Sequence, residues 1–322
     1  MNILISNKMR NSEFMNNDIE INKALEKAEQ AFEENKLIKA LDLYNKVYKL
    51  SKGNDVDAII GLALIYDYLG KSEKVKEYYK EALTIDEYEE RAYYGLAAIY
   101  DDEGNYEKAI KLYNKAIYIN PNYHKAYFFL ANAYDVSGKK ISAIETYEKL
   151  LRLNPMDFWA NLNLGSIYEE ENQNNLAYKK FSTALKIDPN NYLALFNMGV
   201  ICYKFNMLKK AIRFYERAIG KNKDYEYSYL NLAVIYKYID TKKGIKILSK
   251  GINNCINVDF LYYNRSCFYA LINEENNACE DIIKALELYP QFLKYVLEDE
   301  ELESIRELNS FKEFIKKEHR FV

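Results

Sequence analysis

Three of the four prolines of this 322-residue chain, Pro121, Pro155 and Pro189, stand 34 residues apart, and the fourth, Pro290, falls one residue short of three further periods. Proline ends helices, because it lacks an amide hydrogen and its ring clashes with the preceding turn. A helix-ending residue at a fixed interval indicates an internal repeat. The chain is therefore expected to consist of tandem 34-residue repeats.

Two positions of the repeat hold small residues almost throughout. Position 8 carries Ala28, Ala63, Ala97, Ala131, Gly165, Gly199, Ala233 and Ser266. Position 20 carries Ala40, Ala109, Ala143, Ala177, Ala211, Gly244 and Ala278, with Val75 as the exception. Tyrosine recurs at positions 11 and 24, which accounts for much of the tyrosine content of 32 residues. Small residues let two helix backbones come within about 8–10 Å, and the tyrosines fill the space beside them.

The spacing within each repeat predicts two helices and a turn. Positions 4, 7, 8 and 11 follow the i, i+3, i+4, i+7 pattern of one helix face, and positions 20, 24 and 27 do the same in a second helix. Breaks such as Asp102-Glu103-Gly104-Asn105 lie between them, where glycine or asparagine can end a helix in the left-handed conformation. One such hairpin cannot bury its apolar face alone, so neighbours must stack.

These features closely resemble the tetratricopeptide repeat family, for example from Leu96 and Ala97 through Gly104, Ala109 and Pro121. Eight repeats are expected, at residues 21–55, 56–89, 90–123, 124–157, 158–191, 192–225, 226–258 and 259–292. Residues 1–20 form an N-terminal extension, either frayed or a short lead-in helix, and residues 293–322 resemble the capping helices that close such arrays. The resemblance implies an all-α, right-handed superhelical solenoid in which the first helix of each repeat lines a concave wall.

Composition argues against several other functions. A formal charge of −3 lacks the basic excess that nucleic-acid binding rewards, and 11 glycines and two histidines leave little material for phosphate loops or histidine chemistry. The four cysteines form no CxxC pair, and no apolar stretch approaches the ~18 residues that cross a bilayer. We expect a cytoplasmic, non-enzymatic protein with no metal or cofactor.

Positions 2, 5, 6, 9, 12 and 13 of each first helix are not needed for packing and are the candidate binding surface. Apolar and aromatic residues gather there, including Phe128, Trp159, Leu162, Phe196, Tyr227 and Tyr263. Position 6 carries asparagine in the last four repeats, at Asn163, Asn197, Asn231 and Asn264. An asparagine side chain offers both a donor and an acceptor, so this row is expected to pair with the backbone of an extended peptide. The alternatives are that the asparagines are a family trait and that the aromatic residues pack within the array.

Charge divides the same surface along the chain. Acidic residues take its late positions in the earlier repeats, at Asp67, Asp101, Asp102, Asp135, Glu169 and Glu170, whereas Lys204 and Lys237 stand there in repeats 6 and 7. The acidic band indicates a basic ligand segment, unless it is simply a solvated surface. The carboxylate clamp by which some family members hold acidic tails is excluded, since no three consecutive repeats supply its lysine, asparagine and arginine pattern.

These observations predict a scaffold or adaptor that binds an extended peptide or a helix of a partner protein in its groove. The alternatives are self-assembly into a homo-oligomer and service as an accessory subunit of an enzyme complex. No nucleic acid or membrane partner is expected.

Overall fold

The computed structural model describes residues 2–318, with side chains for residues 18–317, and all regular structure in this range is helical. The chain divides into two compact halves, one ending at Pro155 and the other beginning at Met156. Each half is described by itself. No helix among the described residues is both long and apolar enough to traverse a lipid bilayer.

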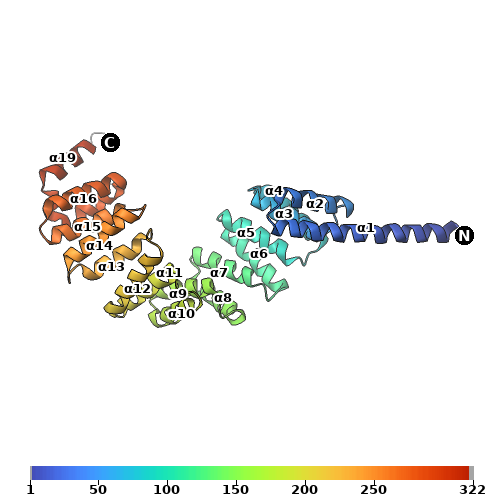
Figure 1. Ribbon diagram of the computed structural model, residues 1–322, viewed down its shortest axis with the longest axis horizontal. Helices are drawn as coiled ribbons and strands as arrows, with labels where there is room; N and C mark the ends of the chain where they lie inside the picture. Colours follow the sequence, from blue (N-terminus) through green and yellow to red (C-terminus); the bar gives the residue numbers. More distant parts are fainter. Residues whose placement is uncertain (1, 319–322) are drawn as a thin grey trace. The chain divides into compact units, whose positions relative to one another are not determined.

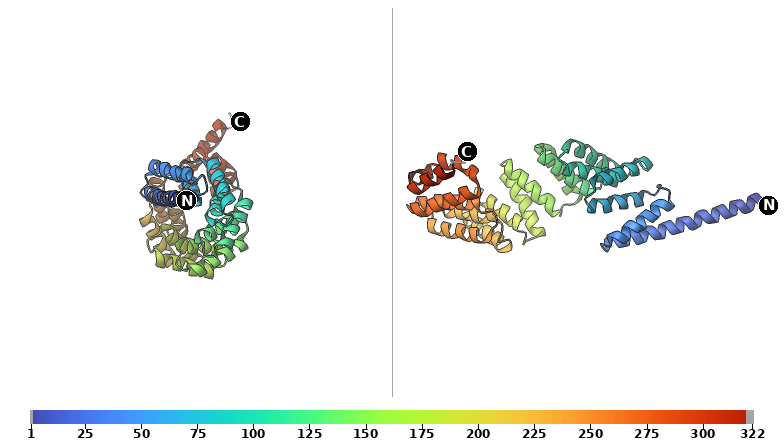
Figure 2. Two further views of the ribbon diagram at one scale, coloured as in Figure 1. Left: turned by 90° about the vertical axis from the view of Figure 1, so that its right-hand side faces the viewer. Right: turned by 90° about the horizontal axis from the view of Figure 1, so that it is seen from above.

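The N-terminal half consists of four helix pairs (Figure 1). Their helices are α1 Asn2–Glu33, α2 Leu37–Leu50, α3 Val56–Tyr68, α4 Ser72–Ile85, α5 Glu90–Asp102, α6 Tyr106–Ile119, α7 His124–Val136 and α8 Lys140–Leu153. Each odd-numbered helix packs against the even-numbered helix after it, and that helix packs against the next pair. Residues 2–20 are helical and belong to α1, which extends past its partner α2 in the views of Figures 1 and 2.

The C-terminal half contains four more pairs and a closing segment. The pairs are α9 Phe158–Glu170 with α10 Asn174–Ile187, α11 Tyr192–Lys204 with α12 Leu208–Lys221, α13 Glu226–Tyr236 with α14 Thr241–Asn254, and α15 Asp259–Leu271 with α16 Glu275–Leu288. The closing segment holds η1 Pro290–Phe292, α17 Leu293–Glu298, η2 Glu300–Leu302, α18 Glu303–Arg306 and α19 Asn309–Glu318. Its buried Val296, Leu302, Ile305 and Phe311 join the apolar cluster of the last pair. The segment thus covers an edge that would otherwise meet water.

The turn inside each repeat forms where the sequence predicts it. Position 15 has a positive φ in every repeat but the seventh, at Asn35, Gly70, Gly104, Gly138, Asn172, Asn206 and Asn273. Only glycine and, to a lesser degree, asparagine adopt this conformation at low cost, so the first helix ends there. Repeat 7 lacks one residue, and its first helix α13 is correspondingly shorter, while Asp240 caps α14 by accepting a hydrogen bond from the Lys243 amide at 3.0 Å. The deletion therefore changes the turn but keeps the pair.

The aromatic ring at position 24 is buried and fits over a glycine in several repeats. An added Cβ at Gly165 or Gly199 would lie 2.6 Å from the ring of Phe181 or Tyr215 in the same repeat. In repeat 2 the ring lies instead over the following repeat, since an added Cβ at Gly95 would stand 2.2 Å from Tyr79. Glycine is thus required at these positions, because a ring crosses close to the helix backbone there.

Candidate functional site

The asparagine row lies on the first helices of the C-terminal half, and its members are half-buried. Asn231 and Asn264 donate from Nδ2 to the carbonyl oxygens of Tyr227 and Phe260, at 3.0 and 2.7 Å. Asn197 reaches across to Ser166 Oγ on α9 at 3.4 Å. Asn231 and Asn264 therefore each use one of the two Nδ2 hydrogens within their own helices, and their carboxamide oxygens accept no hydrogen bond from the described residues. Each of these two amides keeps one donor hydrogen and its acceptor oxygen for the backbone of a ligand.

Aromatic side chains form a continuous strip beside this row. The ring of Phe196 lies 5.1 Å from that of Tyr225, Tyr225 lies 5.6 Å from Tyr227, and Tyr227 is stacked on Phe260 at 5.3 Å. We call Phe196, Tyr225, Tyr227 and Phe260 the aromatic strip. The rings support one another at distances typical of favourable aromatic pairs. Three are half-buried, so Tyr227, with 46% of its surface exposed, is the ring most available to a ligand.

Tyr225 belongs to this strip, although it lies outside the positions predicted to form the binding surface. It is the last residue of repeat 6 and precedes α13. The equivalent residue of repeat 3, Tyr123, packs on Tyr94 at 5.1 Å in the N-terminal half. Tyrosine at position 34 of repeats 3 and 6 is the sequence signal that could have identified Tyr225.

The other predicted apolar residues differ in how far they reach solvent. Trp159 is 50% exposed, and Phe128 is half-buried against Phe129 and Tyr147. The prediction that Leu162 lies on the binding surface is wrong, because only 4% of its surface is exposed and it belongs to the core. Seven residues of α9 are buried, so more than one face of this helix packs against its neighbours. Leu162, at position 5, lies on one of these buried faces. Leu162 cannot contribute to an exposed surface.

Part of the predicted acidic band is neutralised within the protein. Asp135 pairs with Lys140 at 2.6 Å, and Glu169 pairs with Lys204 at 2.5 Å. Glu170 is exposed.

Asp67, Asp101 and Asp102 make no ion pair with any described residue. Burial, reinforced by the charge of Asp102, raises the pKa of both Asp67 and Asp101, and a hydrogen bond from the Tyr113 hydroxyl at 3.3 Å opposes the rise at Asp101. Uncompensated negative charge is thus concentrated at α3 and α5.

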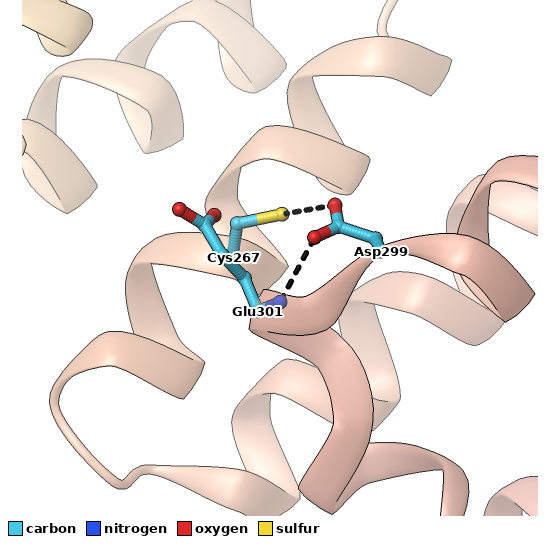
Figure 3. Close-up of side chains that lie close together, drawn as sticks. All are labelled: Cys267, Asp299 and Glu301. Carbon is cyan, nitrogen blue, oxygen red and sulfur yellow. Dashed lines mark hydrogen bonds between the residues drawn. The ribbon is translucent and has the colours of Figure 1, made fainter.

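A second polar cluster lies at the end of the C-terminal half. Cys267 of α15 is buried, with 4% of its surface exposed, and its Sγ lies 3.8 Å from Asp299 Oδ2 (Figure 3). Ligand atoms of Cys267, Asp299 and Glu301 lie within 4.8 Å of one another, close enough to surround a metal ion. Two groups already satisfy these carboxylates, since Lys237 Nζ is 2.6 Å from Glu301 and the Tyr263 hydroxyl donates to Asp299 at 2.6 Å. Burial and both acids also raise the pKa of Cys267, which opposes the thiolate that a metal requires.

Family models decide the identity of the repeats. The model described as "Tetratricopeptide repeat" matches residues 90–123, and a second model of the same description matches residues 56–89, 124–156, 160–191 and 261–292. These matches cover half of the chain. The protein belongs to the tetratricopeptide repeat family.

Solved structures share this tetratricopeptide fold at low sequence identity. A tetratricopeptide repeat protein from Parabacteroides merdae has a TM-score of 0.60 and 17% identity, over 76% of this chain and 97% of that one. Pseudomonas aeruginosa pilF has a TM-score of 0.60 and 16% identity, over 67% and 96%. YrrB, described as a TPR protein with an unusual peptide-binding site, has a TM-score of 0.51 and 22% identity, over 57% and 95%. A comparison with curated protein sequences finds no significant match.

The uncompensated acids of the tetratricopeptide array make stability depend on pH. Asp67 lies in the last turn of α3, where negative charge also opposes the helix dipole. Since its pKa is raised in the folded state, its ionised form destabilises the fold, and this penalty disappears as the pH falls through that pKa. We expect Asp67→Asn to raise the free energy of unfolding at pH 7 by about 0.5 kcal/mol, and this advantage to shrink toward pH 4. Urea denaturation at both pH values measures it, and an equal advantage at both would contradict the assignment.

Proposed function

We propose that the protein is a non-enzymatic scaffold that binds an extended peptide or a helix of a partner protein along the surface of its first helices. The observation that carries the proposal is the aromatic strip with the asparagine row beside it on α11, α13 and α15. Aromatic surface exposed on a helical array is typical of interfaces. Asparagine side chains spaced one per repeat would pair with the backbone of the ligand and orient it without reading its side chains.

The same proposal gives the N-terminal half a preference for positive charge. Asp67, Asp101 and Asp102 offer three carboxylates on α3 and α5 that form no ion pair with the side chains of residues 18–317. A basic ligand segment would offset the burial and the repulsion from Asp102 that together raise the pKa values of Asp67 and Asp101. We therefore place a lysine- or arginine-rich part of the ligand at these helices rather than at Asp135 or Glu169, which are paired.

Replacing Tyr227 with alanine tests the aromatic strip. Exposed aromatic anchors commonly contribute 1–2 kcal/mol or more to an interface, so we expect affinity for a partner purified with the full chain to fall about tenfold or more. Tyr118→Ala is the control, because Tyr118 is 76% exposed on the second helix α6. This substitution removes a similar area of side chain from a different surface. Equal affinities of the two variants, measured by isothermal titration calorimetry, would remove the strip from the interface.

The asparagine row is tested in the same assay by the double variant Asn197→Ala with Asn231→Ala. Two lost hydrogen bonds of about 0.5–1.5 kcal/mol each correspond to a loss of about fivefold or more in affinity. Asn175→Ala with Asn253→Ala, both exposed on second helices, is the matched control. Unchanged binding by the first double variant would leave the aromatic strip as the sole basis of recognition.

We further propose a cytoplasmic location, which the four free cysteines support. Light scattering on the purified chain separates the adaptor from a self-assembling array. A concentration-independent monomer is expected, and a stable oligomer that buries Tyr227 would favour assembly instead.

A further inference from the structure

Asp299 and Glu301, in the middle of the closing segment, lie against the first helices of the last two repeats. Glu301 places both carboxylate oxygens 2.6 Å from Lys237 Nζ, and its Oε1 accepts from the Tyr238 hydroxyl at 3.4 Å. Glu301 and Lys237 are 64 residues apart in the sequence. The contact is therefore tertiary and joins η2 to the end of α13.

Asp299 makes the second half of this contact. Its Oδ1 accepts from the backbone amide of Glu301 at 2.9 Å, as Figure 3 shows. Its Oδ2 accepts from the Tyr263 hydroxyl at 2.6 Å. The segment consequently presents two carboxylates, two residues apart, to a lysine and two tyrosines. Lys237 and Tyr263 occupy positions 12 and 5 of their repeats. These are the positions at which Asp67 and Phe128 stand elsewhere, so the segment lies on the candidate binding surface.

Different side chains hold the segment to the array. Leu302, Val296 and Ile305 are at most 1% exposed in the apolar cluster with Ile282 and Leu286. The Glu301 side chain is 36% exposed, whereas Lys237 beneath it is 17% exposed. Glu301 can therefore swing into solvent while the apolar anchors keep the segment in place, and a second carboxylate can reach Lys237 from outside.

We propose that Lys237 and Tyr238 form a binding site for an acidic stretch of another polypeptide, and that Glu301 is its built-in competitor. The lysine supplies a charge-assisted hydrogen bond and the Tyr238 hydroxyl supplies a neutral donor, while Asp299 keeps the Tyr263 hydroxyl and helps to hold the segment in place. Lysine at position 12 reverses the charge found there in α3 and α5. The two halves of the protein thus recognise oppositely charged ligand segments.

This inference rests on the proposed function only in using the same surface, because neither the aromatic strip nor the asparagine row supplies its donors. A tethered competitor acts at an effective concentration in the millimolar range, which an incoming ligand must overcome. Removing the Glu301 charge should therefore increase, rather than decrease, the affinity for an acidic peptide.

The experiment uses the full chain and a fluorescein-labelled peptide with the sequence of residues 297–303, Leu-Glu-Asp-Glu-Glu-Leu-Glu. By fluorescence anisotropy, we expect Glu301→Gln to bind this peptide about tenfold or more tightly than the unmodified chain. Lys237→Met in the Glu301→Gln background should abolish the gain. The peptide carrying Asp299→Asn and Glu301→Gln should bind neither protein.

Two further variants separate the site from general charge. Glu303→Gln removes an exposed carboxylate of the same segment and should leave binding at the level of the unmodified chain. Glu301→Asp keeps the net charge but shortens the side chain, so it should also increase affinity. Equal binding by Glu301→Gln and the unmodified chain, or a gain that survives Lys237→Met, would overturn the inference. That result would leave the proposed function standing if Tyr227→Ala still weakens partner binding.

Discussion

Asp281→Ala is expected to lower the free energy of unfolding by about 3–5 kcal/mol, because it leaves the guanidinium of Arg265 buried without its counter-charge. Arg265 donates to both oxygens of Asp281 at 2.7 Å and to Ser249 Oγ at 2.8 Å. The side chains of the pair are 16% and 8% exposed. Water can therefore replace little of what the aspartate provides. Urea denaturation followed by circular dichroism measures the loss.

A matched salt bridge on the same helix provides the control. Lys284 and Glu287 of α16 pair at 2.9 Å with about half of each side chain exposed, so Lys284→Ala should cost at most about 0.5 kcal/mol. Adding Arg265→Leu to Asp281→Ala should recover much of the lost stability, since the stranded charge is removed. Additive losses in this double-mutant cycle would show that the two residues act independently and contradict the prediction.

Gly199→Ala is expected to destabilise the protein by about 1–2 kcal/mol, even though alanine favours helix over glycine by about 1 kcal/mol. The new methyl would lie 2.6 Å from Cε1 and 2.8 Å from Cδ1 of Tyr215. Tyr215 is 1% exposed, so its ring has no space into which to retreat. Overpacking therefore outweighs the gain in helix propensity.

Gly220→Ala measures the effect of helix propensity on stability without overpacking. Gly220 lies in α12, and no heavy atom stands within 4 Å of an added Cβ. This variant should stabilise the protein by roughly 0.5–1 kcal/mol, which places the two alanine variants on opposite sides of the unmodified chain in thermal denaturation. Destabilisation by both would mean that backbone freedom, rather than the tyrosine ring, sets the requirement for glycine.

Much of the candidate site could be predicted because it consists of fixed positions in a periodic helix. Tyr227 and Trp159 reach solvent where that periodicity places them. Leu162 does not, since neighbouring helices bury position 5 of α9. Cys267 is likewise covered, because a segment more than 30 residues later in the chain returns to it. Burial by residues that are distant in the sequence cannot be predicted from the spacing of residues within one helix.

The repeat itself follows from the sequence alone. Small residues at positions 8 and 20, and glycine or asparagine at position 15, act through contacts within one hairpin and its neighbour, so their spacing is sufficient to predict helix pairs that stack. Tertiary structure alone decides which way the position-24 rings turn, that Asp281 compensates Arg265 at a position 7 that is apolar in repeats 2 to 7, and that Glu301 returns to Lys237. These outcomes depend on residues brought together from separate helices, where burial and charge act over distance in space and not along the chain.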